Sequence, residues 1–98
     1  MTTTDERQVA AARIEELVSL LRRQQGPDAA RMIDECEALG RAVSAFHMEG
    51  IRFRIYNVDR LLTQHADSLP AEARALLEDA RRHLEAAGFH TRSHQSPV

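Results

Sequence analysis

The residues with the clearest capacity for chemistry or binding lie together near the middle of the chain. They combine basic, acidic and aromatic side chains around one glycine: His47, Glu49, Gly50, Arg52, Phe53, Tyr56 and Arg60. Arg52, Tyr56 and Arg60 are each four residues apart, so on a helix they would share a face. Arginine stacked on tyrosine, with Glu49 and Asp59 nearby, is a common structural arrangement that could also hold an anion or a partner's carboxylate. We interpret these residues as a candidate interaction surface.

No recognisable catalytic or metal-binding pattern accompanies this cluster. The single cysteine, Cys36, lies within two residues of three acidic side chains, which would raise the pKa of its thiol and disfavour a nucleophilic role. Zinc sites normally take four ligands from two closely spaced pairs, and this double spacing is missing. We therefore expect no enzyme activity, no cofactor and no metal. One alternative hypothesis is a ligand- or metal-sensing helical bundle that uses His47, Glu49 and His65.

Composition and charge narrow the class of protein further. The 98 residues suffice for one domain. The net charge is −2 and the 13 basic residues are spread over both halves, so a nucleic-acid partner is not indicated. One cysteine excludes an intrachain disulfide and suits a reducing compartment. The N-terminus lacks the features of a signal peptide, and no apolar run approaches the ~20 residues of a membrane span. We expect a cytoplasmic protein without membrane contact.

The spacing of apolar residues predicts a helix in the N-terminal part of the chain, before the central cluster. A helix is predicted over residues 4–25, where Thr3 and Glu6 have the spacing of a capping box. Its apolar residues recur at spacings of four, three and four: Ala10, Ile14, Leu17 and Leu21. The tripeptide 26–28, Gly-Pro-Asp, then stops this helix and starts the next one. So short a connection predicts that the next helix returns antiparallel to the first.

The cluster itself falls within a long apolar repeat. Apolar or small residues alternate at spacings of three and four, which is the heptad pattern of a coiled coil: Ala29, Met32, Cys36, Leu39, Val43, Phe46, Gly50 and Phe53. We predict one long helix over residues 28–66, with Gly50 near its middle. A second stripe opens after Gly50 and predicts contact with more than one neighbour: Ile51, Ile55, Val58, Leu62 and His65.

A third helix is predicted over residues 69–87, after Ser68 as N-cap and with Pro70 in the first turn. Gly88 is expected to end it in a left-handed conformation, with Phe89 folding back onto the last turn. Residues 90–98 are polar and without periodicity, which is typical of a flexible tail. The predicted architecture is therefore all-α, with one helical domain over residues 1–89.

Helix lengths suggest how these three helices assemble. At 1.5 Å per residue the central helix would be roughly 58 Å long, and the outer helices roughly 33 Å and 27 Å. The outer helices would cover the two halves of the central one, with their ends meeting near Gly50. Such a monomer is only two helices thick, so we expect a homodimer to complete a four-helix bundle.

Residues 51–58 also support a different hypothesis. They alternate apolar and polar side chains and follow a glycine, as in a strand. A strand paired with its copy and followed by two helices resembles a ribbon-helix-helix DNA-binding fold. The main functional prediction is a non-enzymatic helical protein that acts as a homodimer in an interaction or regulatory role. The DNA-binding regulator and the ligand- or metal-sensing bundle are the alternatives.

Overall fold

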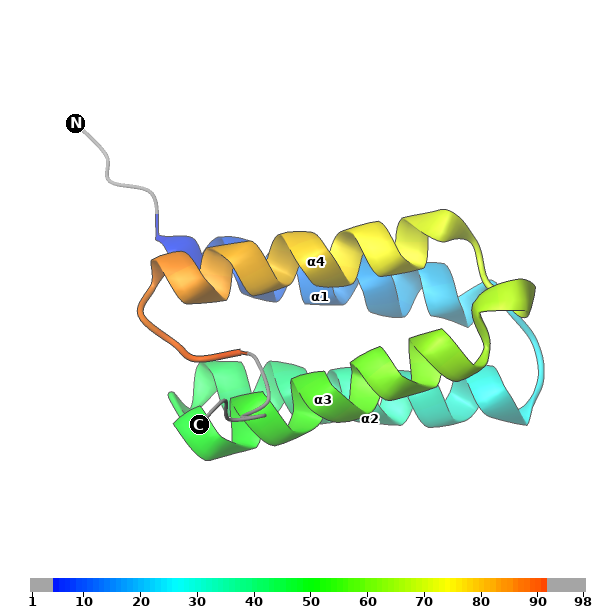
Figure 1. The fold of residues 1–98 in the computed structure, drawn as a ribbon, viewed down its shortest axis with the longest axis horizontal. Helices are drawn as coiled ribbons and strands as arrows, with labels where there is room; N and C mark the ends of the chain where they lie inside the picture. The colour runs from blue at the N-terminus through cyan, green and yellow to red at the C-terminus, as the bar shows by residue number, and fades with distance from the viewer. Residues whose placement is uncertain (1–4, 92–98) are drawn as a thin grey trace, which may run out of the picture.

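The computed structural model describes residues 5–91 and confirms the all-α prediction. It contains four α-helices and a short 3-10 turn: α1 (Glu6–Arg22), α2 (Pro27–Ser44), α3 (Met48–Gln64), η1 (Ala66–Ser68) and α4 (Ala71–Ala86). No strand occurs among the described residues. The helices form an up-down-up-down bundle in which α1 packs against α2 and α4, and α2 packs against α3. Figure 1 shows the α1–α4 pair above the α2–α3 pair.

The predicted long helix over residues 28–66 is wrong, because the chain reverses at residues 45–47. Phe46 has a left-handed backbone, with φ at 58°. The Phe46 N–H donates to the Val43 carbonyl at 3.2 Å, and the His47 N–H donates to the Ala42 carbonyl at 3.0 Å. These are the two hydrogen bonds of a Schellman motif, the usual way in which a helix ends at a left-handed residue. Phenylalanine occupies the position that normally takes glycine.

The same motif ends α4, and there the sequence-based prediction is confirmed. Gly88 has φ at 99°, its N–H donates to the Glu85 carbonyl at 3.0 Å, and the Phe89 N–H donates to the Leu84 carbonyl at 2.9 Å. Because α2 and α4 run in the same direction, the two motifs lie at one end of the bundle. The Phe46 and Phe89 rings meet there, with centroids 6.4 Å apart. The two helix ends therefore share one aromatic contact.

The reversal at Phe46 lets one chain close its own core. The predicted first stripe is buried from Ala29 to Val43, and after the turn Ile51, Ile55 and Val58 enter the same core from α3. A second copy is therefore not needed to cover the apolar faces, contrary to our expectation from a two-helix-thick monomer. The strand hypothesis for residues 51–58 is also wrong. Burial at spacings of four and three is helical, and the apparent alternation arises because Phe53 is exposed.

Helix boundaries differ from the predicted ones at both ends of the bundle. The N-cap of α1 is Asp5, whose carboxylate accepts hydrogen bonds from the N–H groups of Arg7 and Gln8; Thr3 lies outside the described residues. Helix α4 begins at Ala71, after η1 and Pro70. The chain after α4 crosses to the start of α3 (Figure 1), and Thr91 is buried. The remainder of the predicted tail, residues 92–98, lies outside the described part of the chain.

Arginine–carboxylate contacts join α3 to α4, the two neighbouring helices that pack least closely. Asp59 accepts hydrogen bonds from Arg74 at 2.6 Å and from Arg81 at 3.2 Å, and the Arg81 side chain is only 5% exposed. Glu78 lies 3.6 Å from Arg81. Burial alone would raise the pKa of Asp59, but the hydrogen bonds from the two arginines outweigh it and lower that pKa. Asp59 thus supplies the nearest negative charge to a buried guanidinium.

Phe46→Gly and Phe46→Ala separate the cost of the left-handed backbone from the contacts of the ring. Both variants lose the ring, but only glycine adopts a positive φ without steric cost. We expect Phe46→Gly to be more stable than Phe46→Ala by about 1 kcal/mol, after allowing for the greater freedom of glycine in the unfolded chain. Urea unfolding followed by circular dichroism measures the difference. Equal stability of the two variants would contradict a strained turn.

Asp59→Asn should destabilise the protein by about 2 kcal/mol at pH 7, because it removes the closest carboxylate from the buried Arg81. Because the folded-state pKa of Asp59 is lowered, its contribution is present at neutral pH and is lost as the pH falls below about 4. The thermal midpoint of Asp59→Asn should therefore fall less steeply in acid than that of the wild type. Asp34→Asn, at an exposed position on α2, is the control and should follow the wild-type profile. Parallel profiles for all three proteins would rule out this role of Asp59.

Candidate functional site

Four of the seven predicted surface residues form one outward-facing row on α3. Glu49, Phe53, Tyr56 and Arg60 follow one another at spacings of four, three and four, and they are the only exposed residues between Glu49 and Leu61. Phe53 is 57% exposed and Tyr56 is 51% exposed. Residues three and four apart are neighbours on a helix, so the two rings lie side by side with the charges at either end. We call these four residues the α3 stripe.

The structure separates the other three predicted residues from the α3 stripe. His47 is the N-cap of α3, and its Nδ1 accepts a hydrogen bond from the Gly50 N–H at 2.8 Å. Gly50 lies in the first turn of α3 and not at the centre of a long helix. Arg52 is half-buried, and its guanidinium lies 3.5 Å from the Glu49 carboxylate. The predicted common face of Arg52, Tyr56 and Arg60 is therefore divided between a half-buried and an exposed part.

Gly50 is required by two close contacts within the chain. A Cβ at this position would lie 2.5 Å from Nδ1 of His47 and 3.3 Å from Cβ of Ala42 on α2. The first distance is shorter than real Cβ contacts, so any side chain at Gly50 must displace the capping imidazole. Gly50 therefore allows α2 and α3 of one chain to approach closely.

A shallow groove with small apolar side chains runs beside the α3 stripe. It lies between α2 and α3, and its wall includes Ala38 and Ala42 from α2, Ala45 just after α2, and Phe53 from α3. The Arg54 guanidinium lies 5.1 Å from the Phe53 ring centroid and also pairs with Glu35 at 3.1 Å. Arg54 therefore lies over the Phe53 ring and links it to Glu35 on α2. The surface of α2 beside the stripe is recessed, because alanine side chains project little from the helix.

A third exposed aromatic residue, Phe46, lies at the end of the bundle. It is 62% exposed, although its ring is partly covered by Arg7, whose guanidinium lies 4.0 Å from the ring centroid. Arg7 also donates a hydrogen bond to the Val43 carbonyl at 3.4 Å, near the end of α2. Every exposed large hydrophobic residue in the described part of the chain therefore falls between positions 46 and 56.

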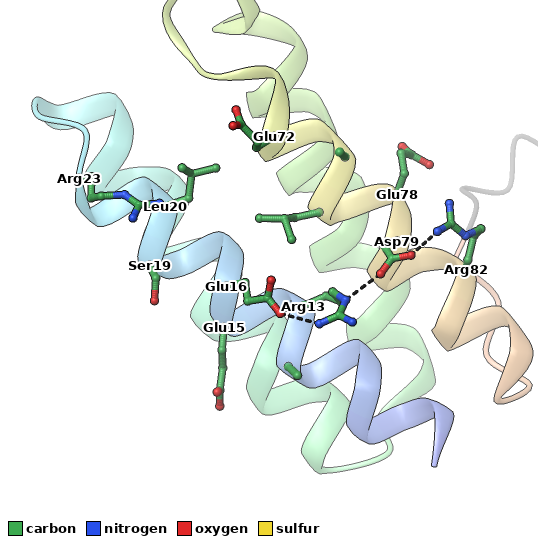
Figure 2. Close-up of a pocket in the computed structure, with 13 residues that line it drawn as sticks. Arg13, Glu15, Glu16, Ser19, Leu20, Arg23, Glu72, Glu78, Asp79 and Arg82 are labelled. Atoms are coloured by element: carbon green, nitrogen blue, oxygen red, sulfur yellow. Dashed lines mark hydrogen bonds and ion pairs between the residues drawn. The ribbon is translucent and has the colours of Figure 1, made fainter. Parts of the chain in front are cut away.

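Charged side chains line the groove between α1 and α4, and ion pairs join those at its centre. Figure 2 shows Arg13 between Glu16 and Asp79, with Arg82 on the other side of Asp79. Arg13 donates to Asp79 at 2.8 Å and to Glu16 at 2.5 Å. The hydrogen bond from Arg13 is the main cause of a lowered pKa at Asp79. We interpret these ion pairs as a link between α1 and α4. Sequence spacing could not reveal the Arg13–Asp79 pair, because its partners lie 66 residues apart in the chain.

Potential metal ligands meet at His83, where they form ion pairs: its Nδ1 lies 2.5 Å from the Glu6 carboxylate and its Nε2 lies 3.7 Å from the Asp79 carboxylate. Cys36 is fully buried, and burial, followed by Glu35 and Glu37, raises the pKa of its thiol to about 12. His47 and His65 cap opposite ends of α3. The three predicted ligands, these two histidines and Glu49, therefore cannot bind one metal ion or small molecule together. Within residues 5–91 no group of three or more histidine, cysteine, aspartate or glutamate side chains is placed to hold a metal ion.

Comparisons with protein-family models, with curated proteins and with solved structures gave no match. Among the helices of the described region, none is both long enough and apolar enough to cross a membrane.

Two glycine substitutions test the close contacts at Gly50. Gly40 lies inside α2, where a Cβ would be 4.0 Å from the nearest side-chain atom, so Gly40→Ala should stabilise the protein by about 0.5–1 kcal/mol through helix propensity. Gly50→Ala should lose that gain, because the new Cβ displaces the His47 cap and presses on Ala42. We expect it to be less stable than Gly40→Ala by about 1.5 kcal/mol. Thermal unfolding would contradict this account if both variants gained equally.

Proposed function

We propose that this protein is a non-enzymatic interaction or regulatory module that acts as a homodimer in the cytoplasm, with the α3 stripe as its binding surface. The observation that carries the proposal is the location of the exposed aromatic residues. Phe46, Phe53 and Tyr56 lie on one short segment, while the other large apolar side chains of the described chain are buried or partly buried. Clustered exposed aromatic side chains are typical of protein–protein binding sites.

The amino acid at position 46 supports a role beyond folding. A left-handed backbone costs a phenylalanine roughly 1–2 kcal/mol, and glycine would make the same turn without that cost. The ring is also mostly exposed, so burial recovers little of this energy. Strained residues of this kind are concentrated at functional sites. Phe46 lies close in sequence to the α3 stripe and would extend the binding surface to the end of the bundle.

The charged groups of the bundle support a non-enzymatic role. Across the α1–α4 groove Arg13 pairs with Asp79, which also pairs with Arg82 on its own helix. Asp59 pairs with both Arg74 and Arg81. Acid–base catalysis needs a group that can reach a substrate, whereas these groups are engaged with each other. The buried thiol of Cys36 is likewise unsuited to nucleophilic attack. A free thiol of this kind fits a reducing, cytoplasmic compartment.

The oligomeric state of the full chain tests the proposal. Light scattering and sedimentation equilibrium should show a monomer–dimer equilibrium over micromolar to millimolar concentrations. The double variant Phe53→Ser/Tyr56→Ser should be monomeric at the same concentrations, with little loss of thermal stability because both side chains are already exposed. Val18→Ser, on the α1–α2 side, is the control and should still dimerise. A wild-type monomer at every concentration, or a dimer that the double variant retains, would contradict the proposal.

A further inference from the structure

We propose that two copies of α3 pack antiparallel about a two-fold axis that passes between Phe53 and Tyr56. This inference rests on the proposed function, because it specifies how the α3 stripe would form the homodimer. The occupant of the stripe is thus a second copy of the same stripe. It follows from the order, spacing and charge of the four exposed residues on α3.

The α3 stripe is symmetric in both chemistry and spacing. Glu49 is four residues before Phe53, and Arg60 is four residues after Tyr56. Both pairs are therefore centred on the same point, between residues 54 and 55. A two-fold interface pairs residue i with residue j and residue j with residue i. Centred on this point, an antiparallel pair places each Phe53 against the partner's Tyr56 and each Glu49 against the partner's Arg60.

The two charges at the ends of the stripe are available for such pairs. Arg60 is exposed and forms no ion pair within residues 5–91. The side chain of Glu49 is 78% exposed and contacts Arg52 only at 3.5 Å. Because opposite charges would meet at both ends of the interface, the stripe is complementary to itself. The pairing would satisfy Arg60 and give Glu49 a second cation.

The same charges disfavour a parallel arrangement. Parallel helices in register would place Glu49 against Glu49 and Arg60 against Arg60, and like charges at an interface are unfavourable. In the antiparallel arrangement the two copies of Glu49 are separated by the length of the stripe, about 16 Å at 1.5 Å per residue. The charge pattern therefore selects one direction of packing.

The surroundings of the stripe allow a helix to approach. The surface beside Phe53 includes Ala38, Ala42 and Ala45, whose short side chains leave space for the partner's aromatic rings between Arg41 and Arg54 at its margin. The distance between packed helices depends on the side chains at the contact, so alanines permit a close one. One helix face from each copy gives an interface at the low end of specific complexes. We therefore expect a dissociation constant on the order of micromolar.

Charge reversal tests the pairing of Glu49 with the partner's Arg60. Glu49→Arg and Arg60→Glu each place like charges together twice, so each single variant should dimerise at least ~10-fold more weakly than the wild type. The double variant Glu49→Arg/Arg60→Glu restores opposite charges and should return to within ~3-fold of the wild type. Glu15→Arg, at an exposed site on α1, is the control and should not change the dimer. Circular dichroism verifies that each variant is folded. A double variant no better than the single ones would refute the pairing.

Cysteine cross-linking tests the direction of packing separately. Under mild oxidation a mixture of Glu49→Cys and Arg60→Cys chains should form a mixed disulfide, while Glu49→Cys alone should form little, because its two thiols are too far apart. The wild type controls for Cys36, which is buried and should not cross-link. A strong cross-link in Glu49→Cys alone would retain the dimer of the proposed function but overturn the antiparallel arrangement. A wild-type monomer in sedimentation equilibrium would overturn both.

Discussion

The left-handed turn at Phe46 is the feature on which the rest of the structure depends. By ending α2 at Ser44 it directs α3 back along the bundle, so that the apolar residues on either side of the turn enter one core. His47 completes the turn as the cap of α3, and Gly50 leaves space for the capping imidazole. A continuous helix through this region would carry the apolar residues of α3 away from this core. One strained residue therefore converts an elongated chain into a closed four-helix bundle.

The position of α3 in the bundle follows from that turn. Its apolar residues enter the common core, and ion pairs of Asp59 with Arg74 and Arg81 also join it to α4. Arg81 is buried and loses water at an energetic cost, which its pair with Asp59 offsets. The face of α3 opposite the core carries the exposed rings of Phe53 and Tyr56 and the exposed charges of Glu49 and Arg60. One face of α3 therefore packs in the core, and the opposite face is the proposed binding surface.

The sequence allowed the helical class, the first turn at Gly26 and the end of α4 at Gly88 to be predicted, because each of these has a local signal. The break at Phe46 had no such signal, since neither glycine nor proline marks it. The shift of the apolar stripe after Gly50 was the available indication, and we interpreted it as contact with additional neighbours of a continuous helix. The apolar residues after Gly50 in fact belong to a new helix, whose buried face begins at a different position of the repeat. The candidate surface residues could be chosen from their side-chain types alone. Which of them belong to the α3 stripe and which to the N-terminal cap of α3 depends on where α3 begins, and that position was not predicted. Pairs such as Arg13 with Asp79 could not be predicted, because only the fold brings them together.

The central claim is that the outward face of α3 is the contact between two copies of the chain. Backbone amide resonances recorded by nuclear magnetic resonance over a dilution series test it most directly. We predict concentration-dependent shifts confined to residues around the α3 stripe, largest near Phe53 and Tyr56, with the α1–α4 groove unchanged. Shifts that map to the α1–α4 groove, or spectra that do not change with concentration, would contradict the account.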